Sequence, residues 1–235
     1  MSCYYKISPS VDLEVIGSSA PLDMKWREQL DPWAPNCLYG LPHSGLLPAD
    51  ARFPDYILSE EGKLTDYTFD SSLGRYLFIS KRFLEVIRQF KLDEHQIFDS
   101  PIQANGMMHP YFILYLVHER REFVLWEKSV FYKRPKAIDW KQAAIDKKMP
   151  EDNEFEPVSG LTFDEFVKLD NSRLIGRKEV LLDRIVLEYD LLRITWPAHQ
   201  IIVSQRLKDA IQQAGLTGMD FKPADWIAGF ADKAG

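Results

Sequence analysis

The sequence predicts an α+β fold with an antiparallel or mixed sheet and short helices, arranged as one domain or as two similar strand–helix lobes. Short β-prone runs bounded by turn residues recur along the chain, as in Tyr76–Ile79 and Ile201–Val203. Both runs lead into a serine and then into apolar residues at helical spacing. The 235 residues include 46% hydrophobic side chains, enough to bury a sizeable core.

Residues 1–55 predict an irregular arm in front of the lobes. Seven of the 14 prolines lie there, and each proline fixes φ and removes a backbone donor. Only residues 23–30 are expected to form a helix. Four aromatic residues are expected to anchor the arm by burial: Trp26, Trp33, Tyr39 and Phe53.

Residues 56–135 predict an N-terminal α+β lobe. Its expected elements are a strand over 66–70, a strand over 76–79, a helix from residue 81 to about residue 90, and strands over 111–117 and 122–132. Ser80 stands at the position that caps this helix. Phe83, Leu84, Ile87 and Phe90 give the helix one apolar face.

Residues 136–235 predict a C-terminal α+β lobe. Its expected elements are a helix over 138–148, a helix from the capping box Thr162–Glu165 to Leu169, strands over 180–189, 191–196 and 201–203, and a helix over 205–214. Ser204 is the expected N-cap of the last helix, and Gly215 stands at the left-handed position that ends it.

Two segments of the chain are alike. Phe78–Phe83 aligns with Ile202–Leu207, and the similarity continues through the helix that follows. After a slip of two residues, Ile97–Pro101 aligns with Met219–Pro223. Duplication and convergence on a common local solution both explain one such pair, and the sequence leaves both open.

The second of these segments resembles a known family. Val203–Lys208, followed by Ala214–Pro223, is similar to the C-terminal signature of immunity protein family eleven, a bacterial group encoded beside polymorphic toxins and secreted effectors. The resemblance covers residues 64–223. Its earlier blocks are Asp66–Phe69, Ile79–Phe83, Tyr111–Leu114 and Glu127–Ser129. The residues expected to form the structural motif are Ser80, Arg82, Ser204, Arg206, Gly215, Gly218, Phe221 and Pro223.

The resemblance implies a cytoplasmic antitoxin that binds a cognate toxin or effector and neutralises it by occlusion. It implies no catalytic residue, metal or cofactor in this chain. Because the toxins of the family are diverse, the resemblance supplies a class of function and not a target.

The charge distribution bears on the partner. With 29 basic and 35 acidic residues, the net charge is −6, which opposes binding to nucleic-acid phosphates. Residues 146–170 contain eight acidic and three basic residues, a net charge of −5. A solvated loop explains this cluster, and so does a docking surface for a basic toxin. The candidate docking residues are Glu151, Asp152, Glu154, Glu156, Asp164 and Glu165.

An enzyme is the main alternative, for example a hydrolase that reverses a toxin's modification. The sequence contains no GxSxG, Walker A or GxGxxG motif, and its five histidines are not paired at i, i+3 or i, i+4. A Cys37/His43 dyad is conceivable, although no catalytic signature flanks it. A regulatory protein-interaction module is a second alternative.

The predicted compartment is the cytoplasm. Cys3 and Cys37 are the only cysteines, so no disulfide framework is expected. The first residues lack the basic and apolar regions of a signal peptide. The longest apolar run, Tyr111–Val117, is far shorter than the ~20 residues that span a bilayer, so no membrane segment is expected.

Overall fold

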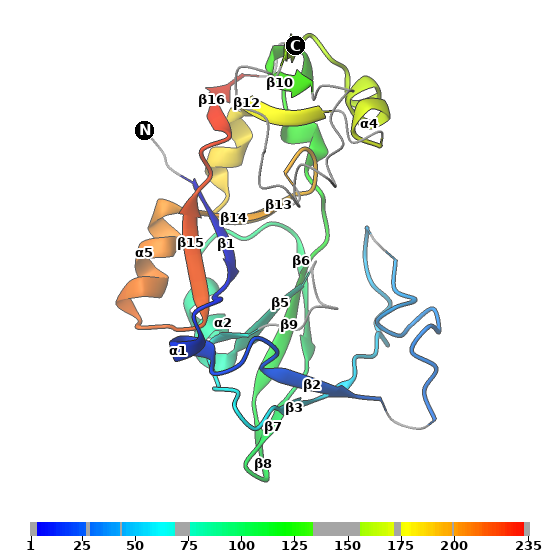
Figure 1. Cartoon of the computed structure of the whole chain (residues 1–235), viewed down its shortest axis with the longest axis vertical. Coiled ribbons are helices and arrows are strands. Elements are labelled where there is room, and N and C mark those ends of the chain that lie inside the picture. The colour runs from blue at the N-terminus through cyan, green and yellow to red at the C-terminus, as the bar shows by residue number, and fades with distance from the viewer. Residues whose placement is uncertain are drawn as a thin grey trace, which may run out of the picture. The chain divides into compact units, whose positions relative to one another are not determined.

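The structure is a computed structural model of the 235-residue chain. It describes residues 4–26, 29–42, 44–68, 76–133, 156–171, 175–198 and 200–232. Within these ranges the chain forms short helices and four four-stranded sheets with antiparallel and some parallel pairing (Figure 1). The predicted α+β class with antiparallel or mixed sheets and short helices is confirmed.

Internal contacts divide the chain into two compact units, each built from segments far apart in the sequence. Unit 1 comprises Met1–Glu119, Tyr189–Ile194 and Gln200–Pro223, and unit 2 comprises Arg120–Glu188, Thr195–His199 and Ala224–Gly235. The predicted lobe boundary between residues 135 and 136 stays a prediction, because residues 134–155 lie outside the described part of the chain.

Unit 1 contains three of the sheets, with strand orders β4-β5-β9-β6, β13-β14-β1-β15 and β2-β3-β7-β8. The strands are β1 (Tyr4–Pro9), β2 (Leu22–Lys25), β3 (Asp55–Leu58), β4 (Tyr67–Thr68), β5 (Tyr76–Ser80), β6 (His95–Asp99), β7 (Ile102–Ala104), β8 (Met107–His109), β9 (Tyr111–Leu116), β13 (Leu191–Ile194), β14 (Gln200–Ser204) and β15 (Met219–Pro223). The helices are α1 (Leu13–Ile16), α2 (Lys81–Ile87) and α5 (Gln205–Gln213).

The first two sheets of unit 1 repeat one arrangement. The series β13, β14, α5 and β15 follows the series β4, β5, α2 and β6, and each element begins 124 residues after its counterpart. The third strand of each sheet has a different origin, because β9 completes the first sheet and the N-terminal β1 completes the second. The registers agree: Tyr111 lies opposite Ser80, and Tyr4 lies opposite Ser204.

The constant offset corrects the sequence alignment of the two segments. The expected two-residue slip placed Ile97–Pro101 over Met219–Pro223, whereas the sheets place His95–Asp99 there. Strand pairing decides this register, because Asp99 lies opposite Phe112 in the first sheet and Pro223 lies opposite Tyr5 in the second.

The two equivalent helices begin at the predicted serines. The Oγ of Ser80 accepts a hydrogen bond from the Phe83 amide at 3.1 Å, and the Oγ of Ser204 accepts one from the Leu207 amide at 3.1 Å. Gly215 follows α5 with a φ of +62°, as expected for the residue that ends a helix. Both predicted N-caps are confirmed.

The strand β5 lies inside the core of unit 1. Its side chains alternate, so that Leu77 and Ile79 join an apolar cluster with α2 and α5, while Tyr76 and Phe78 join a second cluster with Tyr56. All five residues of β5 are buried. This burial explains why β5 reads as an uninterrupted apolar run rather than as an alternating one.

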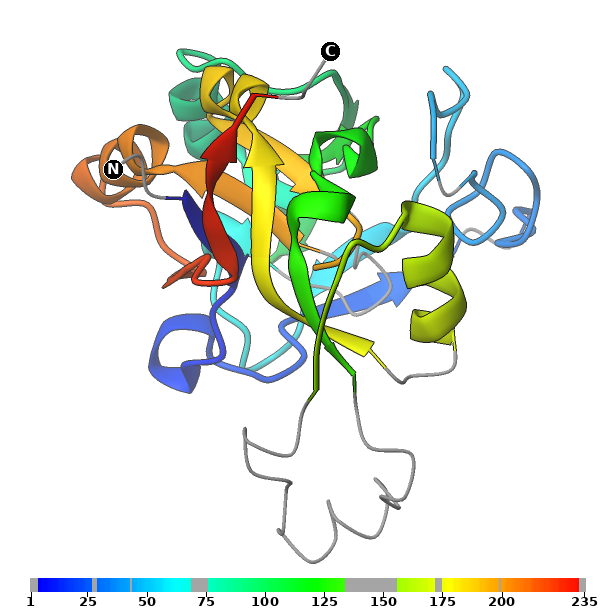
Figure 2. The same ribbon diagram turned by 90° about the horizontal axis from the view of Figure 1, so that it is seen from above.

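Unit 2 is built on the sheet β11-β10-β12-β16, which Figure 2 shows with the helix α4 beside it. Its elements are η2 (Arg121–Phe123), η3 (Trp126–Lys128), β10 (Val130–Lys133), β11 (Glu156–Ser159), α4 (Phe163–Asn171), β12 (Ile175–Asp183), η5 (Arg184–Glu188) and β16 (Ile227–Ala231), where η denotes a 3-10 helix. Its core contains an aromatic cluster of Trp126, Phe131, Phe163, Phe166 and Trp196, with ring centroids 4.8–6.3 Å apart.

Three predicted elements differ from the structure. Residues 22–25 form β2 instead of a helix, because they pair with β3. The strand predicted over 122–132 is restricted to β10, because η2 and η3 precede it and place Trp126 against Phe131. The strand predicted over 180–189 ends at Asp183, whose carboxylate accepts the amide of Ile185 and starts η5. The predicted helix over 138–148 lies outside the described residues.

The N-terminal arm is irregular only in part. Residues 4–25 contain β1, α1 and β2, whereas the described residues from 26 to 54 form no helix or multi-residue strand (Figure 1). Cys37, Leu38, Leu41 and Leu47 anchor this irregular part by burial. Contrary to expectation, Trp33 is 71% exposed and Tyr39 is 37% exposed.

The helices of the described chain have at most nine residues, and none of them is long and apolar enough to cross a membrane.

The position of β1 leads to a test of whether the first residues belong to the core. Ile7 is 4% exposed and packs in the cluster of α2 and α5, so Ile7→Ala should lower the free energy of unfolding by about 2–5 kcal/mol in urea denaturation. Val11, which is 84% exposed, supplies the control: Val11→Ala should change stability by less than about 0.5 kcal/mol. If Ile7→Ala and Val11→Ala change the free energy of unfolding by equally small amounts, β1 is not part of the core.

Candidate functional site

The residues of the predicted structural motif surround two buried carboxylates of unit 1. Near α2, the Oδ1 of Asp66 accepts a hydrogen bond from the Ser80 hydroxyl at 2.7 Å. The Oδ2 of Asp66 accepts the amide of Thr217 at 3.0 Å. Arg82 lies 3.5 Å from the same oxygen and donates to the carbonyl of Ala214 at 3.0 Å. Asp66 therefore joins the cap of α2 to the turn that follows α5.

Asp190 repeats this arrangement near α5. Its Oδ1 accepts hydrogen bonds from the Ser204 hydroxyl at 2.6 Å and from the Arg206 Nε at 3.1 Å. Its Oδ2 accepts the amide of Lys91, which follows α2, at 3.0 Å. Burial alone would raise the pKa of Asp190, but the hydrogen bonds from Arg206, Ser204 and Lys91 outweigh it and hold the pKa below its usual value.

Two buried tyrosines complete the repeat. The Tyr111 hydroxyl donates to the carbonyl of Thr65 at 2.6 Å, and the Tyr4 hydroxyl donates to the carbonyl of Tyr189 at 2.8 Å. Each accepting residue directly precedes one of the two aspartates. Burial is the main cause that raises the pKa of both tyrosines, and the neighbouring carboxylates raise it further. The hydroxyls therefore act here as hydrogen-bond donors.

The remaining motif residues lie on the turn and the strand after α5. Gly218 has a φ of +90°, and a Cβ there would lie 2.1 Å from the Tyr67 carbonyl oxygen, so glycine is required. Phe221 of β15 pairs with Ile7, and Pro223 pairs with Tyr5. These residues thus hold the turn after α5 and the pairing of β15 with β1.

Half of the predicted acidic docking residues fall within the described chain. Glu156 in β11 and Asp164 and Glu165 in α4 are exposed. The Glu165 carboxylate accepts the amide and the hydroxyl of Thr162 at 2.8 Å each, which lowers its pKa and confirms the predicted capping box. Glu151, Asp152 and Glu154 lie outside the described residues.

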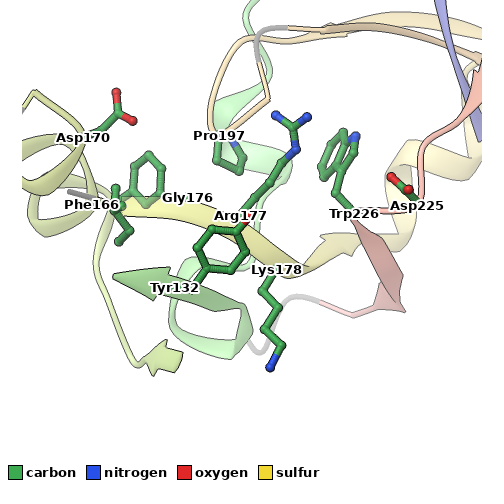
Figure 3. A pocket seen from close by; sticks show the side chains of 10 residues that line it. Tyr132, Phe166, Asp170, Gly176, Arg177, Lys178, Pro197, Asp225 and Trp226 are labelled. Atoms are coloured by element: carbon green, nitrogen blue, oxygen red, sulfur yellow. The ribbon is translucent and has the colours of Figure 1, made fainter. Parts of the chain in front are cut away.

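Unit 2 also contains an open pocket of about 720 Å³ that sequence reasoning missed (Figure 3). Phe166 and Asp170 of the acidic helix α4 form part of its lining. No sequence signal could have revealed it, because its residues come from five separate segments. The lining residues are Tyr132, Phe166, Asp170, Ile175, Gly176, Arg177, Lys178, Pro197, Asp225 and Trp226.

The side chains of the pocket combine charges with aromatic walls. Figure 3 shows Arg177 directed towards Pro197 and Trp226, with Asp170 and Asp225 at opposite ends. The Arg177 guanidinium lies 5.8 Å from the Trp226 ring centroid, and its Nη1 donates to the carbonyl of Ala198 at 3.4 Å. Such a lining suits a polar or charged group better than an apolar ligand.

The structure describes only one residue of the suggested Cys37/His43 dyad. Cys37 is buried, and its suggested partner His43 lies outside the described residues. His118 pairs with Glu94 at 2.7 Å. Within the described ranges, no three His, Cys, Asp or Glu side chains are grouped so as to hold a metal ion.

The buried carboxylate of Asp190 predicts a pH-dependent loss of stability. Asp190→Asn should lower the free energy of unfolding by about 1.5–3 kcal/mol at pH 7, because the charged hydrogen bonds of Arg206 and Ser204 are weakened. The pKa of Asp190 is lower in the folded protein than its value of about 4 in the unfolded chain. The ionised carboxylate therefore stabilises the fold above about pH 4, and this stabilisation is lost as the pH falls.

The difference between the wild type and Asp190→Asn should therefore shrink below about pH 4 in urea titrations. The exposed Asp23 of β2 provides the control, since Asp23→Asn should have little effect at any pH. If Asp190→Asn lowers the free energy of unfolding by the same amount at pH 3 and pH 7, the ionised carboxylate does not have this role.

The sequence of this chain matches no protein-family model, and it matches none of the curated proteins.

Proposed function

We propose that this protein is a cytoplasmic immunity protein that binds a cognate bacterial toxin or effector and occludes its active site or substrate path. Binding requires no cofactor, nucleic acid or membrane. The resemblance of residues 64–223 to immunity protein family eleven supports this class of function. The proposal keeps two similar strand–helix lobes over 56–135 and 136–235, since each range contains one of the repeated strand–Ser–helix segments. Both of these segments belong to the compact unit 1.

The observation that carries the proposal is the exposed acidic character of α4 and its surroundings in unit 2. Asp164 and Glu156 are exposed, and their side chains form no hydrogen bond or ion pair with the residues that the structure describes. Phe166 and Asp170, which lie on α4 with Asp164, line the open pocket. Exposed carboxylates of this kind fit basic side chains of a protein partner.

Such a surface acts mainly on the rate of encounter and on the choice of partner. Acidic groups attract a basic toxin over a distance of about 10 Å at moderate salt, and close charge pairs then slow its dissociation. The carboxylate links of Asp66 and Asp190 hold the scaffold in place before the partner arrives. Little binding energy is then spent on ordering the immunity protein.

If the proposal is correct, a toxin-like protein is encoded beside this gene, and its co-expression with this chain tests the function directly. Cells that produce both proteins should survive, and the two proteins should co-purify as a complex. The purified complex should lack the toxin's activity, because the toxin is occluded. Continued killing without complex formation would contradict the proposal, and rescue by a catalytic amount of this protein would favour the enzyme alternative.

Charge reversal tests the acidic surface. The double variant Glu156→Lys/Asp164→Lys should lower the association rate for the toxin by about tenfold at low salt, as measured by surface plasmon resonance. The effect should shrink at high salt, since salt screens exposed charges. Both substitutions leave Glu165 and its capping box intact.

A matched control separates location from net charge. Glu60→Lys/Glu61→Lys changes the net charge by the same amount on exposed positions of unit 1. This control should retain an association rate within about twofold of the wild type. If both double variants lower the association rate by the same factor, the attraction is a property of the whole chain. The acidic surface of unit 2 is then not the docking site.

A further inference from the structure

The structure displays an exposed aromatic pair in unit 1. Trp33 is 71% exposed and Tyr39 is 37% exposed, and their ring centroids lie 5.0 Å apart with an interplanar angle of 36°. Trp26 lies behind Tyr39 at 6.0 Å. Together these three rings form what is called here the Trp33 platform. A tryptophan as exposed as this one is a frequent centre of protein interfaces.

Backbone hydrogen bonds hold the turn that carries Trp33. The Asp31 carboxylate accepts the Trp33 amide at 2.9 Å, and the Asp31 carbonyl accepts the Ala34 amide at 3.0 Å. The Tyr39 amide donates to the carbonyl of Pro32 at 3.2 Å. The turn is therefore an Asx-type turn with its side-chain cap in place.

The segment around this turn is fixed to the core of unit 1. Leu38 and Leu41 are buried in a cluster with residues of β5 and β9. The side chain of Gln96 bonds to both the amide and the carbonyl of Leu47, at 2.7 and 3.0 Å. A Cβ on Gly40 would lie 2.1 Å from the carbonyl oxygen of Ala34, so the backbone is closely packed there. The platform is thus held in position before any partner binds, which lowers the entropic cost of binding.

The charges of this segment select the occupant. Residues 22–58 contain five acidic and three basic residues, a net charge of −2. The Asp31 carboxylate is anchored in the same turn, where it accepts the backbone amide of Trp33 at 2.9 Å. Elsewhere in the described chain, cations lie over aromatic rings, such as Lys208 at 4.5 Å from the ring centroid of Tyr5. An acidic residue next to an open indole face favours a cation of the partner.

We propose that the Trp33 platform binds a lysine or arginine side chain of the partner protein, with the cation over the indole face and near the Asp31 carboxylate. In identifying the partner as a basic toxin, this inference rests on the proposed function. It adds a second recognition surface, in unit 1, to the acidic surface of unit 2. Tryptophan is the aromatic residue that attracts cations most strongly, which explains why this ring is left exposed.

Substitutions at Trp33 distinguish a cation from an apolar occupant. Trp33→Leu keeps apolar area but removes the aromatic face, so it should weaken binding of the purified toxin by about tenfold in isothermal titration calorimetry. Trp33→Phe keeps a weaker aromatic face and should cost only about threefold. The opposite order, with leucine better tolerated than phenylalanine, would mean that an apolar group covers the platform and would overturn the proposal.

Two further variants serve as controls. Asp31→Asn removes the charge but retains the turn, since the oxygen of the new side-chain amide still accepts the Trp33 amide. This variant should weaken toxin binding about threefold, and the loss should be smaller at high salt. Leu46→Ala removes an apolar side chain that is 63% exposed in the same segment, and it should leave the affinity unchanged. An equal loss for Leu46→Ala and Trp33→Leu would overturn the assignment to Trp33.

A probe that does not depend on the toxin keeps this inference separate from the proposed function. In ¹H–¹⁵N spectra of the wild-type protein, an octa-arginine peptide should shift the indole signal of Trp33, which the Trp33→Phe variant assigns, while octa-glutamate should not. If the toxin fails to bind but octa-arginine shifts this signal, the proposed function fails and the platform stands. If neither peptide shifts the signal, or if it shifts only with the concentration of the protein itself, the platform does not bind cations.

Discussion

The hydrogen bonds of the buried carboxylates Asp66 and Asp190 are the interaction on which unit 1 depends. Each carboxylate accepts from the serine that caps one helix and from the backbone amide that follows the other helix. A buried carboxylate is costly unless donors surround it, so these partners have to be assembled together. The two strand–Ser–helix segments are therefore tied to each other through charges as well as through the apolar contacts of α2 and α5.

This reciprocal arrangement explains why the N-terminal strand lies in the middle of a sheet. The first repeat takes its third strand, β9, from the segment just after β6, whereas the second repeat takes β1 from the start of the chain. The Tyr4 and Tyr111 hydroxyls occupy equivalent positions on these strands and donate to equivalent carbonyls. The repeat is thus complete in space although its order along the chain is permuted.

Under the proposed function, the residues that stabilise the fold are different from the residues that contact the partner. The residues of the structural motif hold helix caps, turns and strands, so our proposal assigns recognition to other parts of the surface. Exposed carboxylates gather in unit 2 on and near α4, and an aromatic platform is displayed in unit 1 by the segment between β2 and β3. We propose that both surfaces favour a basic partner, through electrostatic attraction in one case and cation–π contact in the other.

The sequence by itself determined the features that depend on local chemistry. The caps at Ser80 and Ser204, the end of α5 at Gly215, the capping box at Thr162 and the α+β class were readable, because each rests on neighbouring residues and on short apolar patterns. Only the tertiary structure decided which distant residues bind to these caps and turns. Asp66 and Asp190 each lie 14 residues before their serine and gave no local signal. The strand β2, the inclusion of β1 in a sheet and the pocket of unit 2 were equally hidden, because pairing and packing between remote segments override local propensity.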